Sequence, residues 1–324
     1  MLELDKFIDR KYIFGKGFSQ SDGINIAFGI DKNFAFQMGI TILSIIDNNR
    51  QENLIFNVFA NSIFEKDIEK LKIVAEENGV NINIYVINVE NAEKITGLKW
   101  RAVYNRFFAP LLTDNNNKKV LYLDADIVCL GSLRELFELE FDNNLAMVVE
   151  DQGAVDGYIK TLNLQNGKYF NAGMIFIDIE AWNNNKISEQ ALKMLKDRDL
   201  FLLDQDALNV LLDGKLIYLP IKWNQMCNME KKRTKIYDDT IIVHYASINK
   251  PWHSWCFHSA RMPWLYYFEK SVWCDEKFWN KPKNYREMRM MAAYKLHCKK
   301  YKEFFCWLIK YYKQRKLEKK NKKL

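Results

Sequence analysis

Asn25-Ile26-Ala27-Phe28-Gly29-Ile30 is a short apolar stretch that runs into the polar Asp31-Lys32-Asn33, a pattern that predicts a buried strand ending in a loop. Helices and strands then alternate along the chain. The sequence predicts a helix at 34–46, a strand at 54–60, a helix between a Ser62 N-cap and a Gly79 C-cap, and a strand at 81–88. Strands that alternate with helices pair in parallel and carry helices on both sheet faces. The first ninety residues therefore predict an α/β fold of the nucleotide-binding type.

The alternation continues toward the C-terminus, and one strand there ends in two carboxylates. The apolar residues 120–123 lead into Asp124-Ala125-Asp126, after a helical segment at 101–112 and a polar loop at 113–117. Further predicted elements are strands at 145–149, 174–178, 216–219 and 241–244, and helices near 180–196 and 205–212. Because ligands of open α/β sheets bind outside the carboxyl ends of the strands, we expect the chemistry at Asp124 and Asp126.

Asp124 and Asp126 are candidate ligands of a divalent cation. One residue separates them, so in extended backbone both side chains leave the same side, and carboxylates are the ligands that such ions prefer. His244 also ends a predicted strand, and an imidazole in the set favours Mn²⁺ over Mg²⁺. Lys250 offers a positive charge for a phosphate. The structural alternatives are a helix cap at Asp126 and a hydrogen-bonded core histidine at His244.

The charge of the chain is concentrated in its last thirty residues. Residues 295–324 hold twelve Lys or Arg against two Glu, a charge of +10 within a total of +7, so residues 1–294 sum to −3. A nucleic-acid-binding protein carries its positive charge on the folded face that meets the phosphates, so we expect no nucleic-acid partner. The tail also has aromatic and apolar residues at three- and four-residue spacings, at Tyr301, Phe304, Phe305, Leu308 and Tyr312. This pattern predicts a helix on an anionic membrane surface, with a solvated tail packed on the body as the alternative.

Cysteine spacing and the N-terminus indicate the compartment. The six cysteines lack paired short spacings and the density of a disulfide scaffold, which predicts reduced thiols and no structural zinc. The N-terminal sequence is too charged for a secretory signal, and no stretch approaches the roughly 18 uncharged residues of a membrane-spanning helix. We therefore expect a cytoplasmic protein, peripheral on the inner face of the cytoplasmic membrane.

Several segments in this order resemble glycosyltransferase family 8, especially bacterial α-galactosyl- and α-glucosyltransferases that extend the lipopolysaccharide core. The resemblance runs from about Asn25 to His253 and is carried by residues 27–34, Arg106, residues 122–126, Tyr169-Phe170-Asn171-Ala172-Gly173, Asp204-Gln205-Asp206, and His244-Tyr245 with Lys250-Pro251-Trp252-His253. It implies one nucleotide-sugar-binding, Rossmann-like domain of the GT-A type with a mixed sheet, at residues 23–262. Residues 1–22 are then an N-terminal extension, and residues 263–324 are a C-terminal aromatic and basic helical region that associates with the membrane.

Carried over residue by residue, the resemblance implies a nucleotide-sugar site made of Gly29, Ile30, Asp31, Asn33, Phe34, Arg106, Asp124, Ala125, Asp126, Asp151, Asn171, Ala172, Asp204, Gln205, His244, Ser247 and Lys250. Within this set the resemblance gives Asp124, Asp126 and His244 to the metal, Mn²⁺ with Mg²⁺ as the alternative. Phe34 stacks on the uracil where similar enzymes mostly have Tyr, and Ser247 stands where many have Gly. Asp204 and Gln205 are the implied catalytic residues beside the transferred hexose.

The resemblance implies a retaining hexosyltransferase that uses UDP-glucose or UDP-galactose and a lipid-linked oligosaccharide acceptor. Gln205 is a poor nucleophile, which favours front-face attack by the acceptor, with Asp204 as a transient nucleophile in the alternative mechanism. Capsule, teichoic or protein acceptors are alternatives, and so is a non-catalytic scaffold that binds UDP-sugars. A phosphoryl transferase is disfavoured because the chain has no Gly-x-x-x-x-Gly-Lys-Ser/Thr loop.

Overall fold

The computed structural model describes residues 4–15, 23–111, 118–154, 156–230 and 234–321, so the loop predicted at 113–117 lies outside the described residues. The chain forms two compact units: unit 1 is Met1–Gln225 with Tyr237–His244, and unit 2 is Met226–Ile236 with Tyr245–Leu324. The geometric division near residue 245 therefore differs from the boundary drawn at residue 262 from the sequence. Each unit is described by itself below.

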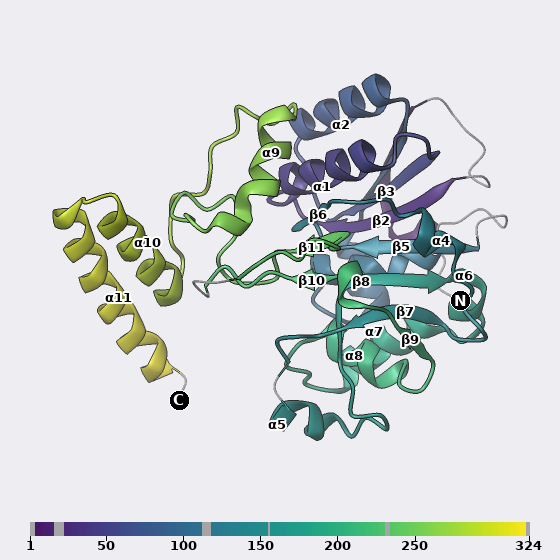
Figure 1. The fold of residues 1–324 in the computed structure, drawn as a ribbon. Helices are drawn as coiled ribbons and strands as arrows, with labels where there is room; N and C mark the ends of the chain where they lie inside the picture. The colour runs from purple at the N-terminus through teal and green to yellow at the C-terminus, as the bar shows by residue number, and fades with distance from the viewer. Residues whose placement is uncertain (1–3, 16–22, 112–117, 155, 231–233, 322–324) are drawn as a thin grey trace. The chain divides into compact units, whose positions relative to one another are not determined.

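Unit 1 is built on an eight-stranded mixed sheet with the order β1-β4-β3-β2-β5-β8-β7-β9 (Figure 1). The parallel strands predicted from the first ninety residues are confirmed: β2 (Ile24–Ile30), β3 (Leu54–Ala60) and β4 (Asn81–Ile87) pair in parallel. On the other side of β2 lies β5 (Lys119–Leu123), which pairs in parallel with β2. The next strand, β8 (Phe170–Asp178), is antiparallel to β5. The chain thus leaves β2 toward one side first and toward the other side later, which makes the β2–β5 boundary a topological switch point.

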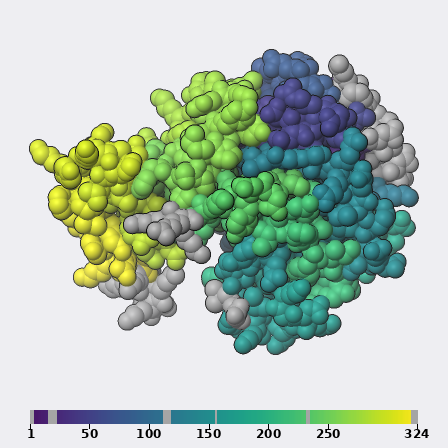
Figure 2. Space-filling model, viewed as in Figure 1, coloured from purple at the N-terminus to yellow at the C-terminus, as the bar shows by residue number. Residues whose placement is uncertain are grey.

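Helices cover both faces of this sheet, as continuous apolar strands require. Every residue of β3 and β4 is buried. Helices α1 (Ala35–Asn48) and α2 (Glu65–Asn78) lie together on one face, and Figure 2 shows them side by side on the surface. The opposite face packs its apolar side chains, including Phe59 and Tyr122, against a segment of 3₁₀-helix, η3 (Ala102–Leu111), and the helices that follow β8.

The remaining helices and strands of unit 1 are η1 (Leu4–Phe7), β1 (Ile8–Phe14), α3 (Val89–Thr96), β6 (Ile127–Cys129), α4 (Arg134–Glu138), β7 (Ala146–Glu150), α5 (Asp156–Ile159), η4 (Lys160–Leu162), α6 (Ile179–Asn184), α7 (Ile187–Asp197), α8 (Asp204–Leu211), β9 (Leu216–Tyr218), η5 (Ile221–Trp223) and β11 (Ile242–His244), together with the first residue of β10 (Gln225–Met226). A second, three-stranded sheet has the order β10-β11-β6.

Two local predictions need correction. Ser62 is not the N-cap of α2, because the helix begins at Glu65 after an extended Phe64 and has no side-chain cap. The helix predicted at 180–196 is two helices, since Lys186 adopts a left-handed conformation between α6 and α7. Gly79 is confirmed as the C-terminal cap of α2, with φ of 66°.

The N-terminal segment is part of the sheet rather than a separate extension. Strand β1 pairs with β4 in an antiparallel register, with Ile8 opposite Ile87 and Phe14 opposite Ile82. Phe7 is buried, and its ring centroid lies 5.1 Å from that of Phe108. Residues 4–15, which belong to the segment 1–22 predicted as an extension, thus supply an edge strand and a core side chain.

The described part of unit 2 is mainly helical and has a tryptophan-rich centre. Its helical elements are η6 (Ser259–Arg261), α9 (Met262–Lys270), α10 (Tyr285–His297) and α11 (Tyr301–Asn321), and the last two run side by side (Figure 1). The buried tryptophans are Trp252, Trp255, Trp264 and Trp273. Within the described residues, none of the helices combines the length and the apolar character that a membrane span requires.

Candidate active site

A cavity of about 360 Å³ opens at the switch point between β2 and β5, within the usual volume range of ligand pockets. Its walls come from the end of β2, the loop that begins α1, the segment η3 and the residues after β5. The lining residues are Gly29, Ile30, Asp31, Phe34, Ala102, Val103, Arg106, Tyr122, Asp124, Ala125 and Asp126. The carboxyl ends predicted to form the site therefore do meet at one cavity.

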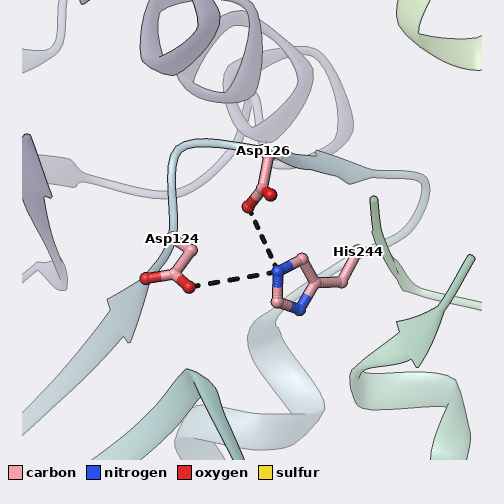
Figure 3. Close-up of side chains that lie close together, drawn as sticks. All are labelled: Asp124, Asp126 and His244. Carbon is pink, nitrogen blue, oxygen red and sulfur yellow. Dashed lines mark ion pairs between the residues drawn. The ribbon is translucent and has the colours of Figure 1, made fainter. Parts of the chain in front are cut away.

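Three side chains at this edge converge in a way that suits a cation (Figure 3). Ligand atoms of Asp124, Asp126 and His244 all lie within 4.8 Å of one another. His244 Nε2 is 3.1 Å from Asp126 Oδ1 and 4.0 Å from Asp124 Oδ2. Atoms held about 2.1 Å from one octahedral ion lie roughly 3 to 4.2 Å apart, so this set fits a divalent metal.

Backbone pairing and buried polar side chains of α1 position the three ligands. Strand β11 pairs with β6 so that His244 lies opposite Ile127, directly beside Asp126. On α1, the buried Thr41 hydroxyl lies 2.7 Å from the carbonyl oxygen of Ile127, and Ser44 Oγ accepts from the Cys129 backbone N–H. The segment that carries the carboxylates is thereby held against a helix rather than left as a loose loop.

The orientation of the His244 ring is determined by its second nitrogen. Nδ1 lies 3.1 Å from the side-chain oxygen of Asn224, which is fully buried. An amide oxygen only accepts, so Nδ1 is the donor of this bond, and Nε2 is the ring nitrogen that faces the two carboxylates. Gly173 lies against the other side of the ring, where an added Cβ would be 2.2 Å from His244 Cε1.

Arg106 joins Asp124 to a second buried carboxylate. Its Nη2 donates to Asp124 Oδ1 at 3.1 Å and its Nε lies 3.0 Å from Asp204 Oδ2. The Tyr122 hydroxyl also donates to Asp124 Oδ1, which leaves Oδ2 to face His244. Burial alone would lower the pKa of Arg106, but Asp204 and Asp124 hold it above its usual value. The guanidinium is therefore a permanent cation between the two acids.

Asp204 begins α8 under unusual conditions for a carboxyl group. Burial raises its pKa to about 6, against the opposing effect of Arg106. Leu203, just before it, has φ of 49° and ψ of −118°, a strained conformation for a residue with a side chain. Asp206 holds this helix start in place by accepting from the Leu202 backbone N–H at 2.7 Å and from the Tyr169 hydroxyl at 2.5 Å.

Gln205 and its neighbours form a connected group of amides. Gln205 Oε1 accepts from Ala172 N–H at 3.0 Å and from Asn171 Nδ2 at 3.3 Å. Its Nε2 donates to Asp151 Oδ2 at 3.2 Å. The structure thus brings together Asp151, Asn171, Ala172 and Gln205, which are distant in the sequence.

The other predicted residues lie in three places. Gly29, Ile30, Asp31 and Phe34 line the cavity, whereas Asn33 is exposed and is not among the lining residues. Its backbone N–H donates to Asp31 Oδ1 at 2.8 Å. Ser247 and Lys250 belong to unit 2, where Lys250 Nζ donates to the Tyr245 carbonyl at 2.7 Å. Their contacts with a donor stay a prediction.

Sequence reasoning did not select Tyr122, Gly173 or Asn224 as site residues. Tyr122 and Gly173 lie inside the motifs that carry the family resemblance, and their position within those motifs was the signal that could have found them. Asn224 follows a short segment of 3₁₀-helix and contacts residues 20 and 53 positions away, so no local pattern marks it.

The sequence of this chain is similar to those of known glycosyltransferases. The model of glycosyl transferase family 8 matches residues 25–256. The chain is 34% identical to lipopolysaccharide 1,3-galactosyltransferase of Salmonella typhimurium, over 93% of this chain and 94% of that protein. It is 32% identical to lipopolysaccharide 1,2-glucosyltransferase of Escherichia coli K12, over 79% of this chain and 80% of that protein.

Among solved structures, the fold is similar to galactosyltransferase LgtC in complex with donor and acceptor sugar analogues. The TM-score is 0.65 at 22% identity, over 82% of this chain and 99% of LgtC. At that identity the likeness concerns the fold alone, which is of the GT-A type.

Proposed function

The chain belongs to glycosyltransferase family 8, and from this premise we propose that it is a retaining, Mn²⁺-dependent hexosyltransferase. The proposed donor is UDP-glucose or UDP-galactose, and the proposed acceptor is the lipid-linked core oligosaccharide of lipopolysaccharide. The names of the two relatives given above contain a galactosyl or a glucosyl group and lipopolysaccharide, which supports this choice of sugars and acceptor. The proposed catalytic domain is residues 23–262, and residues 263–324 are the proposed membrane-associating region.

The observation that carries the proposal is the convergence of Asp124, Asp126 and His244 at the mouth of the switch-point cavity. In this assignment the three side chains hold Mn²⁺, with Mg²⁺ as the alternative, and the uridine lies against Gly29, Ile30 and Phe34. Bound there, the ion would neutralise the negative charge that develops on the UDP leaving group. Arg106 holds the Asp124 carboxylate in its orientation, because it contacts one of its oxygens and leaves the other for the ion.

The contacts of Gln205 favour front-face attack by the acceptor. Its side-chain oxygen already accepts two hydrogen bonds, and an amide oxygen so engaged is a weak nucleophile. Asp204 is the alternative nucleophile, but its carboxylate is buried and its Oδ2 is paired with Arg106, a cation that weakens the carboxylate as a nucleophile. We therefore assign Asp204 and Gln205 to stabilising and shielding the sugar as the glycosidic bond breaks.

The first experiment measures UDP release from UDP-glucose and UDP-galactose, with and without Mn²⁺, in wild type and in Asp126→Ala. We expect Mn²⁺-dependent release in wild type and a loss of roughly 10²-fold or more in the variant, because a stabiliser of the developing charge is removed. Glu90→Ala is the matched control, since Glu90 is an exposed carboxylate on α3 that pairs with Lys94. Its rate should equal that of wild type.

Two outcomes would contradict the proposal. Undiminished Mn²⁺-dependent release in Asp126→Ala would remove the metal site from Asp126. Binding of UDP-sugars without cleavage, even with core oligosaccharide acceptors present, would instead favour the non-catalytic scaffold. Transfer to capsule, teichoic or protein acceptors in place of core oligosaccharide would keep the chemistry and change the acceptor.

Helix α11 supports a peripheral place on the inner face of the cytoplasmic membrane, where lipid-linked acceptors would be within reach. Tyr301, Phe305, Ile309 and Tyr312 follow one another at three- and four-residue spacings and are each more than half exposed. The exposed row differs in part from the row of apolar residues predicted from the sequence, because Phe304 and Leu308 of that row are half-buried. Exposed lysines at 302, 310 and 313 accompany the exposed row, as in helices that lie in the headgroup region.

Replacing both Phe305 and Ile309 by Ser should weaken binding to vesicles that contain phosphatidylglycerol by at least about tenfold, since each buried apolar side chain contributes roughly 1.5–3 kcal/mol. Co-sedimentation with the vesicles measures this binding. Ile13→Ser on β1 is the control, because Ile13 is also exposed, at 62%. Equal binding of wild type and the double variant would rule out α11 as the membrane contact.

A further inference from the structure

An unbroken row of hydrogen bonds connects the proposed metal ligand His244 to the proposed sugar contact Gln205. Asn224 Oδ1 lies 3.1 Å from His244 Nδ1, and Asn224 Nδ2 donates to Asn171 Oδ1 at 3.1 Å. Asn171 Nδ2 then donates to Gln205 Oε1 at 3.3 Å, and Gln205 Nε2 donates to Asp151 Oδ2 at 3.2 Å. We call the three amides Asn224, Asn171 and Gln205 the amide relay. All five residues belong to unit 1.

Backbone groups determine the direction of the relay. The Gly173 N–H donates to Asn171 Oδ1 and the Ala172 N–H donates to Gln205 Oε1. A backbone N–H cannot donate to the NH₂ group of an amide, so neither amide can be turned around without losing this bond. Asn171 must therefore receive from Asn224 through its oxygen, and Asn224 must turn its own oxygen toward His244.

The consequence reaches the metal site through the imidazole. Because Asn224 offers an acceptor, His244 donates from Nδ1 and turns Nε2 toward Asp124 and Asp126, where it can bind the metal. Asn224 is fully buried and His244 is 2% exposed, so water does not replace a lost partner. In such surroundings a hydrogen-bonded row holds its members in one arrangement.

We propose that Asn224 is a positioning residue that fixes His244 for the metal and, through the amide relay, ties the metal site to the side chain that contacts the transferred sugar. The inference rests on the proposed function, since it takes His244 as a metal ligand and Gln205 as a sugar contact. Asn224 itself touches neither the metal nor the donor in this assignment.

Two substitutions separate the two ends of the relay. Asn224→Leu removes the acceptor for His244 and the donor for Asn171. Asn224→Asp keeps an oxygen for His244 Nδ1 but places a second oxygen against Asn171 Oδ1, which breaks only the link toward Gln205. Aspartate is also a common natural partner of metal-binding histidines.

The first readout is the dissociation constant of Mn²⁺ alone, from electron paramagnetic resonance of the free ion, with no donor present. Asn224→Leu should weaken Mn²⁺ binding by about 10- to 100-fold, the usual effect of removing such a partner. Asn224→Asp should bind Mn²⁺ at least as tightly as wild type. The second readout is UDP release at saturating Mn²⁺, where Asn224→Asp should be slower by about tenfold or more, an effect of the size that partner loss produces.

Unfolding midpoints without Mn²⁺ show whether each variant is folded. If Asn224→Leu does not fold, Asn224→Asp alone tests the inference, because it should keep the Mn²⁺ affinity of wild type and lose turnover. Wild-type Mn²⁺ affinity in a folded Asn224→Leu would overturn the inference, as would an Asn224→Asp variant that turns over at the wild-type rate. Both results leave the proposed function standing. Failure of wild type to bind Mn²⁺ would instead defeat the proposed metal site and this inference with it.

Discussion

Gly173→Ala is expected to abolish Mn²⁺-dependent UDP release while the chain stays folded. A Cβ at this position would lie 2.2 Å from His244 Cε1 and 2.8 Å from Asp124 Oδ2, distances that real Cβ atoms do not adopt. Gly173 is not among the residues with positive φ, so alanine fits the backbone and the only conflict is one of space. His244 must move, and a displacement near 1 Å lowers a rate by roughly 10²-fold.

The matched control is Gly157→Ala, where an added Cβ meets no atom within 4 Å. Both variants receive the same methyl group, so a difference between them reports the surroundings. UDP release and the Mn²⁺ dissociation constant are measured for each, and the Gly173 variant should lose both. Normal Mn²⁺ binding by Gly173→Ala would mean that the ring is not confined as the structure places it.

Arg106→Met should lower the free energy of unfolding by about 3–5 kcal/mol, the range for removing one partner of a buried ion pair. Arg106 is 6% exposed and contacts two acids, Asp124 and Asp204, which would be left without their cation. Methionine keeps much of the apolar volume, so the loss reports mainly the charge. Urea unfolding near pH 7 measures it.

The pH dependence of this variant has a definite sign. In wild type the pKa of Asp204 is already raised to about 6 by burial, with Arg106 opposing the shift. Removing Arg106 raises it further, so the native variant binds a proton near neutral pH that the unfolded chain does not bind. Stability of the variant relative to wild type should therefore fall as pH rises from 5 to 8.

Arg10→Met is the control for Arg106→Met. Arg10 is also paired with a carboxylate, that of Asp9, but both side chains are more than half exposed. Exposed pairs contribute about 0–1 kcal/mol, so this change should be nearly neutral. Equal destabilisation by the two substitutions would contradict the description of Arg106 as a buried cation between two acids.

Local patterns were sufficient to predict the parallel strands β2, β3 and β4 of the central sheet. The strands around Ile26, Val58 and Ile84 are short apolar runs separated by helical periodicity, and all three are confirmed as parallel strands. The carboxyl-end rule then placed Asp124 and Asp126 at the cavity, because it depends only on strand direction. Arg106 needed the family resemblance, since a lone arginine in a helical segment has no distinguishing local pattern.

Features that depend on distant partners could not be predicted in this way. Strand β1 contains three consecutive charged residues, Asp9, Arg10 and Lys11. These residues interrupt the apolar pattern by which a strand is recognised in a sequence. Asn224 has its role from contacts with His244 and Asn171, and nothing beside it in the sequence indicates either. The split of the helix at Lys186 depends on packing rather than on propensity, which is a weak guide to single residues.

The pairing of β11 with β6 also sets an order of events during synthesis. Asp124 and Asp126 leave the ribosome 118 or more residues before His244, which at 5–20 residues per second is roughly 6–24 s. Until then β6 lacks its partner strand, and the two carboxylates have no imidazole. A nascent chain can therefore complete its proposed cation site only when the last strand of unit 1 has been made.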